Sequence, residues 1–261
     1  MTRTILITSG KGGVGKTTLT SNLAYALTAL GESVIAVDAN LTTPNLGLHF
    51  GMPLAPNTLH DVLKGKVKLE KAIYPHPFGF KFIPASMSVN ALIGADVAKL
   101  ANVTFRLTGR ADYVLLDCAA GLGRESISAI YAADEILLVT NPDLPSVADA
   151  LKTANVAKQM NKNIIGVVVN RRKRRRKPGK YELSLNEIRE ILELPVVSQI
   201  PEDKAVAESI AAKRPIIDYA PYSPAAIEIA RLAHKLSGRR FEYQKPLGAR
   251  IIERFMDWTN R

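Results

Sequence analysis

The sequence of 261 residues predicts an α/β fold: a mostly parallel, twisted sheet of about seven to eight strands with helices on both faces. Two observations carry this prediction. Apolar runs suited to buried strands alternate along the chain with amphipathic, helix-like stretches. The runs also lack the polar alternation of a half-exposed strand, so both faces of the sheet must be covered.

Seven apolar runs are the expected strands: Ile5–Thr8, Val34–Val37, Lys81–Ile83, Tyr113–Leu116, Ile136–Val139, Ile164–Val169 and Val196–Ile200. Amphipathic helices are expected at Val147–Met160, Leu185–Leu192 and Asp203–Lys213. Four of the runs lead into a polar residue: Asp38, Asp117, Asn141 and Asn170. Because ligands bind at the carboxyl ends of strands in such sheets, this edge is the expected nucleotide crevice.

Composition excludes several classes of protein. Hydrophobic residues make up 47% of the chain, enough for a full core. The one cysteine, Cys118, excludes an internal disulfide and a C-x-x-C metal site, and we expect it to be a small buried residue. The four histidines have no metal-ligand spacing. With no signal peptide and no apolar run long enough to span a bilayer, a cytosolic protein is expected.

The positive charge is concentrated in one place. The net charge is +11, and the run "RRKRRRK" from Arg171 to Lys177 supplies seven positive charges, which leaves +4 for the rest. The run follows Asn170 at a strand end, so a loop is predicted. Two interpretations are open: a solvated loop, or contact with a polyanion, either anionic lipid headgroups or DNA phosphates.

The stretch from Gly10 to Thr17 fits the phosphate-binding pattern G-x-x-x-x-G-K-[ST]. A strand precedes it and a helix with apolar residues at helical spacing follows it, so backbone N–H groups and the helix N-terminus face one point. Lys16 is expected to reach the β- and γ-phosphates, and the Thr17 hydroxyl to ligate Mg²⁺. The expected nucleotide-binding residues here are Gly10, Lys11, Gly12, Gly13, Val14, Gly15, Lys16, Thr17 and Thr18. The fold is therefore predicted to be that of a P-loop NTPase.

Two acids end apolar strands. Asp117 closes "YVLLD", the form of a Walker B element, and its expected role is to hold the Mg²⁺ shell through water. Asp38 closes "VIAVD" in the same way. For both residues the alternative is a carboxylate that caps the next helix.

These motifs occur together with "VDANLTTPNLGLHFG", "DCAAGL", "VTNPDLPSV", "VVVNR" and "IPED", and in this order the chain resembles the MinD/ParA family, most closely its MinD branch. The family comprises ATPases with a deviant Walker A motif. The resemblance covers roughly residues 1–237. It implies hydrolysis of ATP to ADP with Mg²⁺, a homodimer with ATP bound, and an unidentified regulatory or cargo protein as partner.

The resemblance also implies roles for individual residues. The second lysine of the loop, Lys11, would cross the dimer interface to the phosphates bound by the partner subunit. Asn170 would hydrogen-bond the adenine edge, and the turn of Pro201, Glu202 and Asp203 would line the base pocket. Residues 38–46 would form switch I and residues 117–121 switch II.

One departure from the family concerns catalysis. Its switch I carries D-x-D, where the second acid orients the attacking water, but here the stretch reads Asp38-Ala39-Asn40. Asn40 has no charge and cannot accept a proton from water. Two explanations are open: a naturally slow or non-hydrolysing member, or a residue changed to trap an ATP-bound dimer.

After the core domain, residues 238–249 are interpreted as a linker and residues 250–261 as an amphipathic helix. On a helical wheel Ile251, Ile252, Phe255 and Trp258 share an arc bordered by arginines, which suits a membrane interface. MinD proteins carry a membrane-targeting helix at this place. The alternative is a helix that packs on its own domain.

Three hypotheses follow. The first is a MinD-like ATPase that dimerises with ATP, binds an anionic membrane surface by its tail and positions a partner protein, located in the cytoplasm at the inner face of the cell membrane. The second is a non-hydrolysing, nucleotide-dependent binding module. The third is a ParA-like dimer that binds DNA nonspecifically through residues 171–177.

Overall fold

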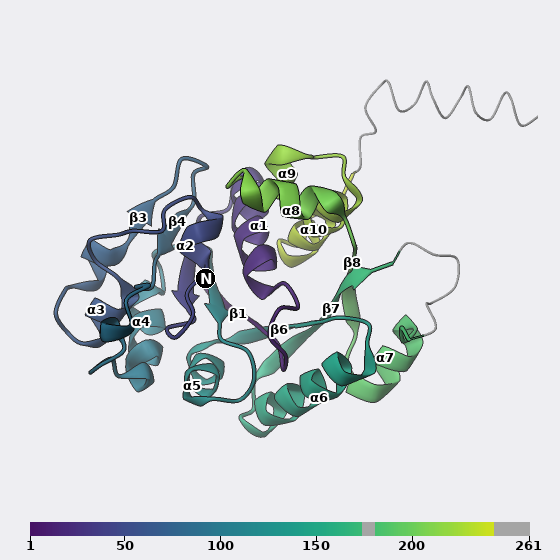
Figure 1. The fold of residues 1–261 in the computed structure, drawn as a ribbon, viewed down its shortest axis with the longest axis horizontal. Helices are drawn as coiled ribbons and strands as arrows, with labels where there is room; N and C mark the ends of the chain where they lie inside the picture. Colours follow the sequence, from purple (N-terminus) through teal and green to yellow (C-terminus); the bar gives the residue numbers. More distant parts are fainter. Residues whose placement is uncertain (174–180, 243–261) are drawn as a thin grey trace, which may run out of the picture.

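The computed structural model describes residues 1–173 and 181–242, and it shows an eight-stranded sheet in the order β3-β4-β2-β5-β1-β6-β7-β8 (Figure 1). Every pair of neighbouring strands is parallel except β3 and β4. Helices cover both faces of the sheet, so the α/β prediction is confirmed.

The strands are β1 (Arg3–Thr8), β2 (Val34–Ala39), β3 (Tyr74–Pro75), β4 (Lys81–Ile83), β5 (Tyr113–Cys118), β6 (Glu135–Thr140), β7 (Asn163–Arg172) and β8 (Val196–Pro201). All seven predicted strands are present. The additional strand, β3, has two residues and ends in proline, as suits an edge strand.

The α-helices are α1 (Lys16–Ala29), α2 (Leu46–His49), α3 (Leu59–Leu63), α4 (Leu100–Leu107), α5 (Arg124–Ala132), α6 (Leu144–Gln159), α7 (Leu185–Leu192), α8 (Lys204–Ala211), α9 (Ile216–Tyr219) and α10 (Pro224–Leu236). Short 3₁₀ turns are η1 (Leu69–Ala72), η2 (Val89–Ala91) and η3 (Val97–Lys99). Among the described helices, none is both long and apolar enough to cross a membrane.

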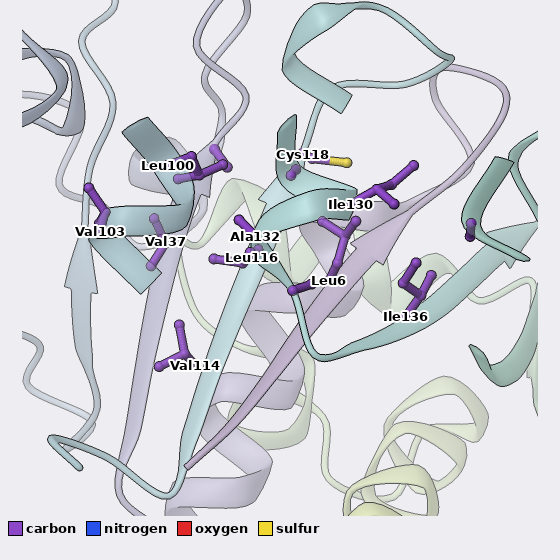
Figure 2. Close-up of a cluster of buried hydrophobic side chains, with 14 of the residues drawn as sticks. Leu6, Val37, Leu100, Val103, Val114, Leu116, Cys118, Ile130, Ala132 and Ile136 are labelled. Atoms are coloured by element: carbon purple, nitrogen blue, oxygen red, sulfur yellow. The ribbon is translucent and has the colours of Figure 1, made fainter. Parts of the chain in front are cut away.

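The sheet separates two apolar cores. Leu6 of β1 faces one core, and its neighbours Ile5 and Ile7 face the other, because side chains alternate along a strand. Helices α4 to α7 cover the first core, part of which Figure 2 shows, and α1 and α10 cover the second. Cys118 is buried in the first core as expected, and burial raises the pKa of its thiol to about 12.

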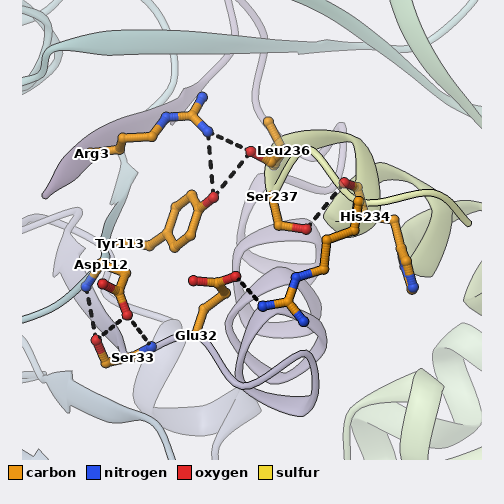
Figure 3. Close-up of polar contacts among 9 residues, drawn as sticks. Arg3, Glu32, Ser33, Asp112, Tyr113, His234, Leu236 and Ser237 are labelled. Carbon is orange, nitrogen blue, oxygen red and sulfur yellow. Dashed lines mark hydrogen bonds and ion pairs between the residues drawn. The ribbon is translucent and has the colours of Figure 1, made fainter. Parts of the chain in front are cut away.

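The end of α10 is anchored at the amino edge of the sheet (Figure 3). Tyr113 at the start of β5 donates its hydroxyl to the Leu236 carbonyl oxygen at 3.0 Å, and Arg3 of β1 donates to the same oxygen. Arg239 pairs with Glu32, which follows α1, at 2.8 Å. The last described residues therefore leave the domain at the edge opposite the carboxyl ends of the strands.

The structure corrects one prediction about the basic run. Arg171 and Arg172 are not in a loop but belong to β7, because the strand continues past Asn170 to pair with β8 at Pro201. Residues 174–180, which are the last four residues of the run and the three that follow it, lie outside the described residues. So do residues 243–261, which include most of the predicted linker and the whole predicted tail helix with Ile251, Ile252, Phe255 and Trp258.

Candidate nucleotide-binding site

The phosphate-binding loop connects β1 to α1, and two of its glycines are required by the backbone. Gly15 is the N-cap residue of α1 with φ of 102°, and a Cβ there would lie 2.3 Å from Nδ2 of Asn170. Gly10 lies so close to α6 that a Cβ would come within 2.1 Å of the Asp149 backbone. Gly15 is thus required by its left-handed backbone, and Gly10 by its close approach to α6. Both features are typical of a loop that exposes its backbone N–H groups.

Lys16 points into the loop rather than into solvent. It is buried, and its Nζ donates to Oγ of Ser9 at 2.9 Å. Ser9 in turn donates to the Lys11 carbonyl oxygen at 2.7 Å. The ammonium group therefore lies inside the curve of the loop, where phosphate oxygens would meet it. The sequence analysis did not identify Ser9.

Two carboxylates lie side by side at the carboxyl edge of the sheet. Asp38 and Asp117 are register partners in neighbouring strands, and both are buried. Thr17 donates its hydroxyl to Oδ2 of Asp117 at 2.6 Å. Burial raises the pKa of Asp117 to about 6, and burial with the neighbouring Asp117 charge raises the pKa of Asp38 well above its ordinary value. Two adjacent buried acids beside a hydroxyl fit a hard divalent cation such as Mg²⁺.

The helix-capping alternative applies to Asp38 and not to Asp117. Oδ2 of Asp38 accepts from the backbone N–H of Leu46, the first residue of α2, at 3.0 Å. The helix after Asp117 begins at Arg124 with Gly123 as its N-cap residue. Asp117 instead accepts from the hydroxyls of Thr17 at 2.6 Å and Thr20 at 3.5 Å.

Asn40 is buried, and Thr43 occupies both ends of its amide. Nδ2 donates to the Thr43 carbonyl oxygen at 2.7 Å, and Oδ1 accepts from the Thr43 N–H at 3.2 Å and from its hydroxyl at 3.1 Å. The amide thus closes a turn in the 38–46 loop. A carboxylate could keep the two acceptor contacts but not the donor contact.

The sequence analysis missed Glu125, in the first turn of α5. One of its oxygens accepts from the backbone N–H groups of Leu41 at 3.1 Å and Thr42 at 3.4 Å, and the other accepts from the Thr42 hydroxyl. Glu125 therefore joins the 38–46 loop to the helix that follows the 117–121 loop. An acidic residue at a helix start is a common pattern, so nothing in the sequence marked this one.

The side chain of Lys11 contacts Asp143, before α6, rather than its own phosphate loop. Its side chain is half exposed, and Nζ is 3.9 Å from Oδ1 of Asp143. That carboxylate also caps α6 by accepting from the Ser146 N–H at 3.0 Å. An exposed ion pair of this length contributes little to stability, so the lysine can change partner at low cost.

Two adjoining cavities lie at the end of the loop. The first, of about 320 Å³, is lined by Gly12, Gly13, Gly15, Lys16, Thr17, Thr18, Asn40, Thr43, Asn45, His49, Ala120 and Arg171. The second, of about 260 Å³ and more apolar, is lined by Gly15, Thr18, Leu19, Asn170, Arg171, Ile200, Pro201, Glu202, Asp203, Val206, Ala207, Ile210 and Ile229. We call them the phosphate-side cavity and the base-side cavity.

The structure brings together the four residues predicted for the base pocket, Asn170 and the turn 201–203. The Asn170 amide donates to the Val14 carbonyl oxygen at 2.7 Å, which fixes it against the loop. The Asp203 carboxylate is used to join two helices, because it accepts from Ala205 in α8 and from Ala225 in α10. Its place in the pocket wall is therefore structural.

A parallel sheet with a glycine-rich phosphate loop between β1 and α1 defines a P-loop NTPase. The ParA family, described as NUBPL iron-transfer P-loop NTPase, matches residues 1–237. An uncharacterised ATP-binding protein of Methanocaldococcus jannaschii is 40% identical over 240 residues, which are 92% of this chain and 89% of that protein. The chain belongs to the MinD/ParA family of P-loop ATPases.

Solved MinD structures have the same fold. MinD of Pyrococcus horikoshii, in a complex with Mg-ADP, is 38% identical with a TM-score of 0.86 over 90% of this chain and 96% of that one. MinD in the MinC:MinD complex of Aquifex aeolicus is 32% identical with a TM-score of 0.80 over 93% and 98%. The predicted resemblance to the MinD branch is confirmed.

Proposed function

We propose that this chain binds Mg-ATP across the two cavities and hydrolyses it to ADP. The phosphates would lie in the phosphate-side cavity against Lys16, and the adenine in the base-side cavity beside Asn170. Thr17 would ligate Mg²⁺, and Asp38 and Asp117 would hold its water shell. The cation would supply Lewis-acid charge to the phosphates. The pair of buried acids and the Mg-ADP complex of a MinD relative support this assignment.

We further propose that ATP joins two copies of the chain through Lys11. The observation that carries this proposal is the contrast between the two lysines of one loop. Lys16 is buried in its own site, whereas Lys11 is half exposed at the mouth and, among the described residues, is held by a 3.9 Å contact to Asp143. A cation so placed suits the phosphates of a facing subunit, in the manner of an arginine finger.

Light scattering tests the dimer. Mg-ATP should convert monomer to dimer and Mg-ADP should not. Lys11→Ala should remain a monomer with Mg-ATP while binding the nucleotide with nearly unchanged affinity in calorimetry, because Lys11 serves the opposite site. Lys152→Ala, which removes another exposed lysine, is the matched control and should dimerise normally. A Lys11→Ala protein that dimerises like this control would refute the role in trans.

The chemistry of Asn40 favours slow hydrolysis of ATP. It is also the reason for the second hypothesis, a nucleotide-dependent binding module that does not hydrolyse ATP. Its amide is engaged with Thr43 at both ends and carries no charge, so it offers no base to the attacking water. We propose that the ATP-bound dimer is therefore long-lived. Turnover measured against the Lys16→Ala protein as a blank decides between a slow ATPase and a module with no turnover at all.

Relatives suggest the setting of this activity. Several are named septum site-determining protein MinD, and one solved assembly is a MinC:MinD complex. We propose that the dimer positions a partner protein at the inner face of the cell membrane, which it binds through residues 250–261. Co-sedimentation with anionic liposomes and with DNA, each with and without ATP, separates this function from DNA binding through residues 171–177.

A further inference from the structure

Arg171 has a backbone conformation that is unusual for its type and place. Its φ is +54°, in the left-handed region that residues with a Cβ adopt only at a cost, and it lies near the end of a strand. The register between β7 and β8 shifts between Val169 and Arg172, around this residue. Irregularities of this kind re-aim side chains beside functional sites.

Two consecutive residues of β7 line the same cavity at this irregularity. In a regular strand the side chains of Asn170 and Arg171 would point to opposite faces. Here both residues line the base-side cavity, and Arg171 lines the phosphate-side cavity as well. The next residue, Arg172, is directed elsewhere, since its guanidinium donates to Oε1 of Gln199 on β8 at 2.5 Å.

We infer that Arg171 is a nucleotide-binding residue whose guanidinium binds the phosphate chain where the two cavities meet. This inference rests on the proposed function. Gly15, Thr18 and Arg171 line both cavities, and Arg171 is the charged residue of the three. A guanidinium forms short, paired hydrogen bonds with phosphate oxygens, and it would add a second cation to Lys16 in the same subunit. The strained backbone at Arg171 is the cost of this placement.

Calorimetry with Mg-ADP on the full chain tests the inference. Arg171→Ala should weaken binding roughly tenfold or more, because a hydrogen bond to a charged group is lost. Arg171→Lys keeps the charge but not the paired hydrogen bonds, so its affinity should lie between those of the Ala variant and the parent chain. Arg172→Ala removes one positive charge from the adjacent position and should bind as the parent chain does. Equal affinity of Arg171→Ala and Arg172→Ala would overturn the inference, and a Lys variant as weak as the Ala variant would overturn the role of the charge.

A thermal melt distinguishes a specific loss of nucleotide binding from general damage to the fold. Glycine adopts a left-handed backbone without strain, so Arg171→Gly should melt roughly 2–4 °C above Arg171→Ala without nucleotide. It should nevertheless bind Mg-ADP as weakly as the Ala variant. A Gly variant that keeps the parent affinity would sink the assignment. If the parent chain itself fails to bind Mg-ADP, the proposed function fails first, and this outcome is distinguishable from all the others.

Discussion

At the scale of single residues, Asn40 differs from an aspartate in its hydrogen bonds to Thr43 as well as in its charge. Relative to the D-x-D motif of the family, the visible difference at position 40 is the missing negative charge. The structure shows that the amide also donates to Thr43, across a turn that the acid would have to open. Asp38 lies close by, because its Oδ1 accepts from the Asn40 N–H at 3.3 Å. An aspartate at position 40 would therefore face the Thr43 carbonyl oxygen, next to a backbone N–H that already donates to the Asp38 carboxylate.

We expect Asn40→Asp to lower stability and raise turnover together. Without nucleotide, the free energy of unfolding should fall by about 1–3 kcal/mol, because the Thr43 carbonyl loses its donor. With Mg-ATP, ATP turnover should rise by a factor of about 10²–10⁴, because a carboxylate can then act on the attacking water. Denaturant unfolding and a phosphate-release assay measure the two effects.

Asn40→Ala is the matched control for this prediction. It also removes the donor to Thr43 but adds no acid, so it should lose stability without gaining turnover. A rise in turnover of the same size in Asn40→Ala would show that loosening the loop, and not the carboxylate, limits the reaction.

The residue scale also shows what the sequence can predict of the site. The placement of Lys16 follows from the phosphate loop and the strand before it, which are contiguous, whereas the Thr17 hydroxyl reaches Asp117 from 100 positions away. Glu125 acts on Leu41 and Thr42 from 84 and 83 positions away, and no local pattern marks such a pair. Arg171 was assigned to a charged loop because charge was the only visible signal, whereas its position depends on pairing with β8.

At the scale of elements, the hairpin of β3 and β4 depends on a neutral histidine. His76, just after β3, is buried and stacks on Phe80 with ring centroids 4.4 Å apart. Its Nδ1 accepts from the Phe78 N–H at 3.3 Å, and its Nε2 donates to the Phe50 carbonyl oxygen at 3.1 Å. This pattern requires a proton on Nε2 alone, and burial lowers the pKa of His76 below its ordinary value of 6.5.

The sign of the resulting pH effect follows from that lowered pKa. In the unfolded chain His76 takes up a proton near pH 6.5, but in the folded chain only at a lower pH. Its contribution to stability is therefore complete above pH 6.5 and is lost as the pH falls toward the folded value. Asp38 and Asp117 act in the opposite direction, because the pKa values of both carboxyls are raised. The whole chain shows only the sum of these effects.

His76→Gln isolates the histidine. The stability difference between the parent chain and this variant should shrink as the pH is lowered from 7.5 to 5.5, by at most about 1.4 kcal/mol per pH unit. Denaturant unfolding at a series of pH values measures it. Parallel curves for the two proteins would contradict the prediction.

The same hairpin shows why some elements could not be predicted. The strands that form the centre of the sheet, such as β1 and β5, are continuous apolar runs and were predicted. The edge strand β3 has only two residues, and its pairing with β4 is set by the turn at Gly79 and by aromatic packing around His76. Packing of this kind is made by the folded chain and leaves no periodic signal.

At the scale of the whole molecule, the proposed nucleotide site and the end of α10 lie at opposite edges of the sheet. The residues proposed to bind the nucleotide lie at the carboxyl ends of the strands, and α10 ends against Arg3 and Tyr113 at the opposite edge. The described chain thus ends, at residue 242, at the edge opposite the proposed nucleotide site. A link between ATP and the tail is therefore expected to come from dimerisation, which places two tails on one particle.

We expect membrane binding to need both ATP and an apolar tail face. Two linked helices gain effective concentration, so the ATP-bound dimer should sediment with anionic liposomes far better than the ADP-bound chain. Phe255→Glu should abolish sedimentation in every nucleotide state, because it charges the apolar arc. Asn260→Glu adds the same charge to the opposite side of the wheel and should still sediment. Retention of Phe255→Glu, or equal loss in both variants, would contradict the membrane helix.

The burial of Cys118 has a practical consequence for all of these measurements. It is the one thiol of the chain, and at a pKa of about 12 almost none of it is thiolate near neutral pH. Maleimide reagents, which react with thiolates at accessible positions, should leave the parent protein unmodified. A cysteine introduced on the surface would then be the sole reactive position, so a dye or spin label can report distances between two subunits without first removing a native residue.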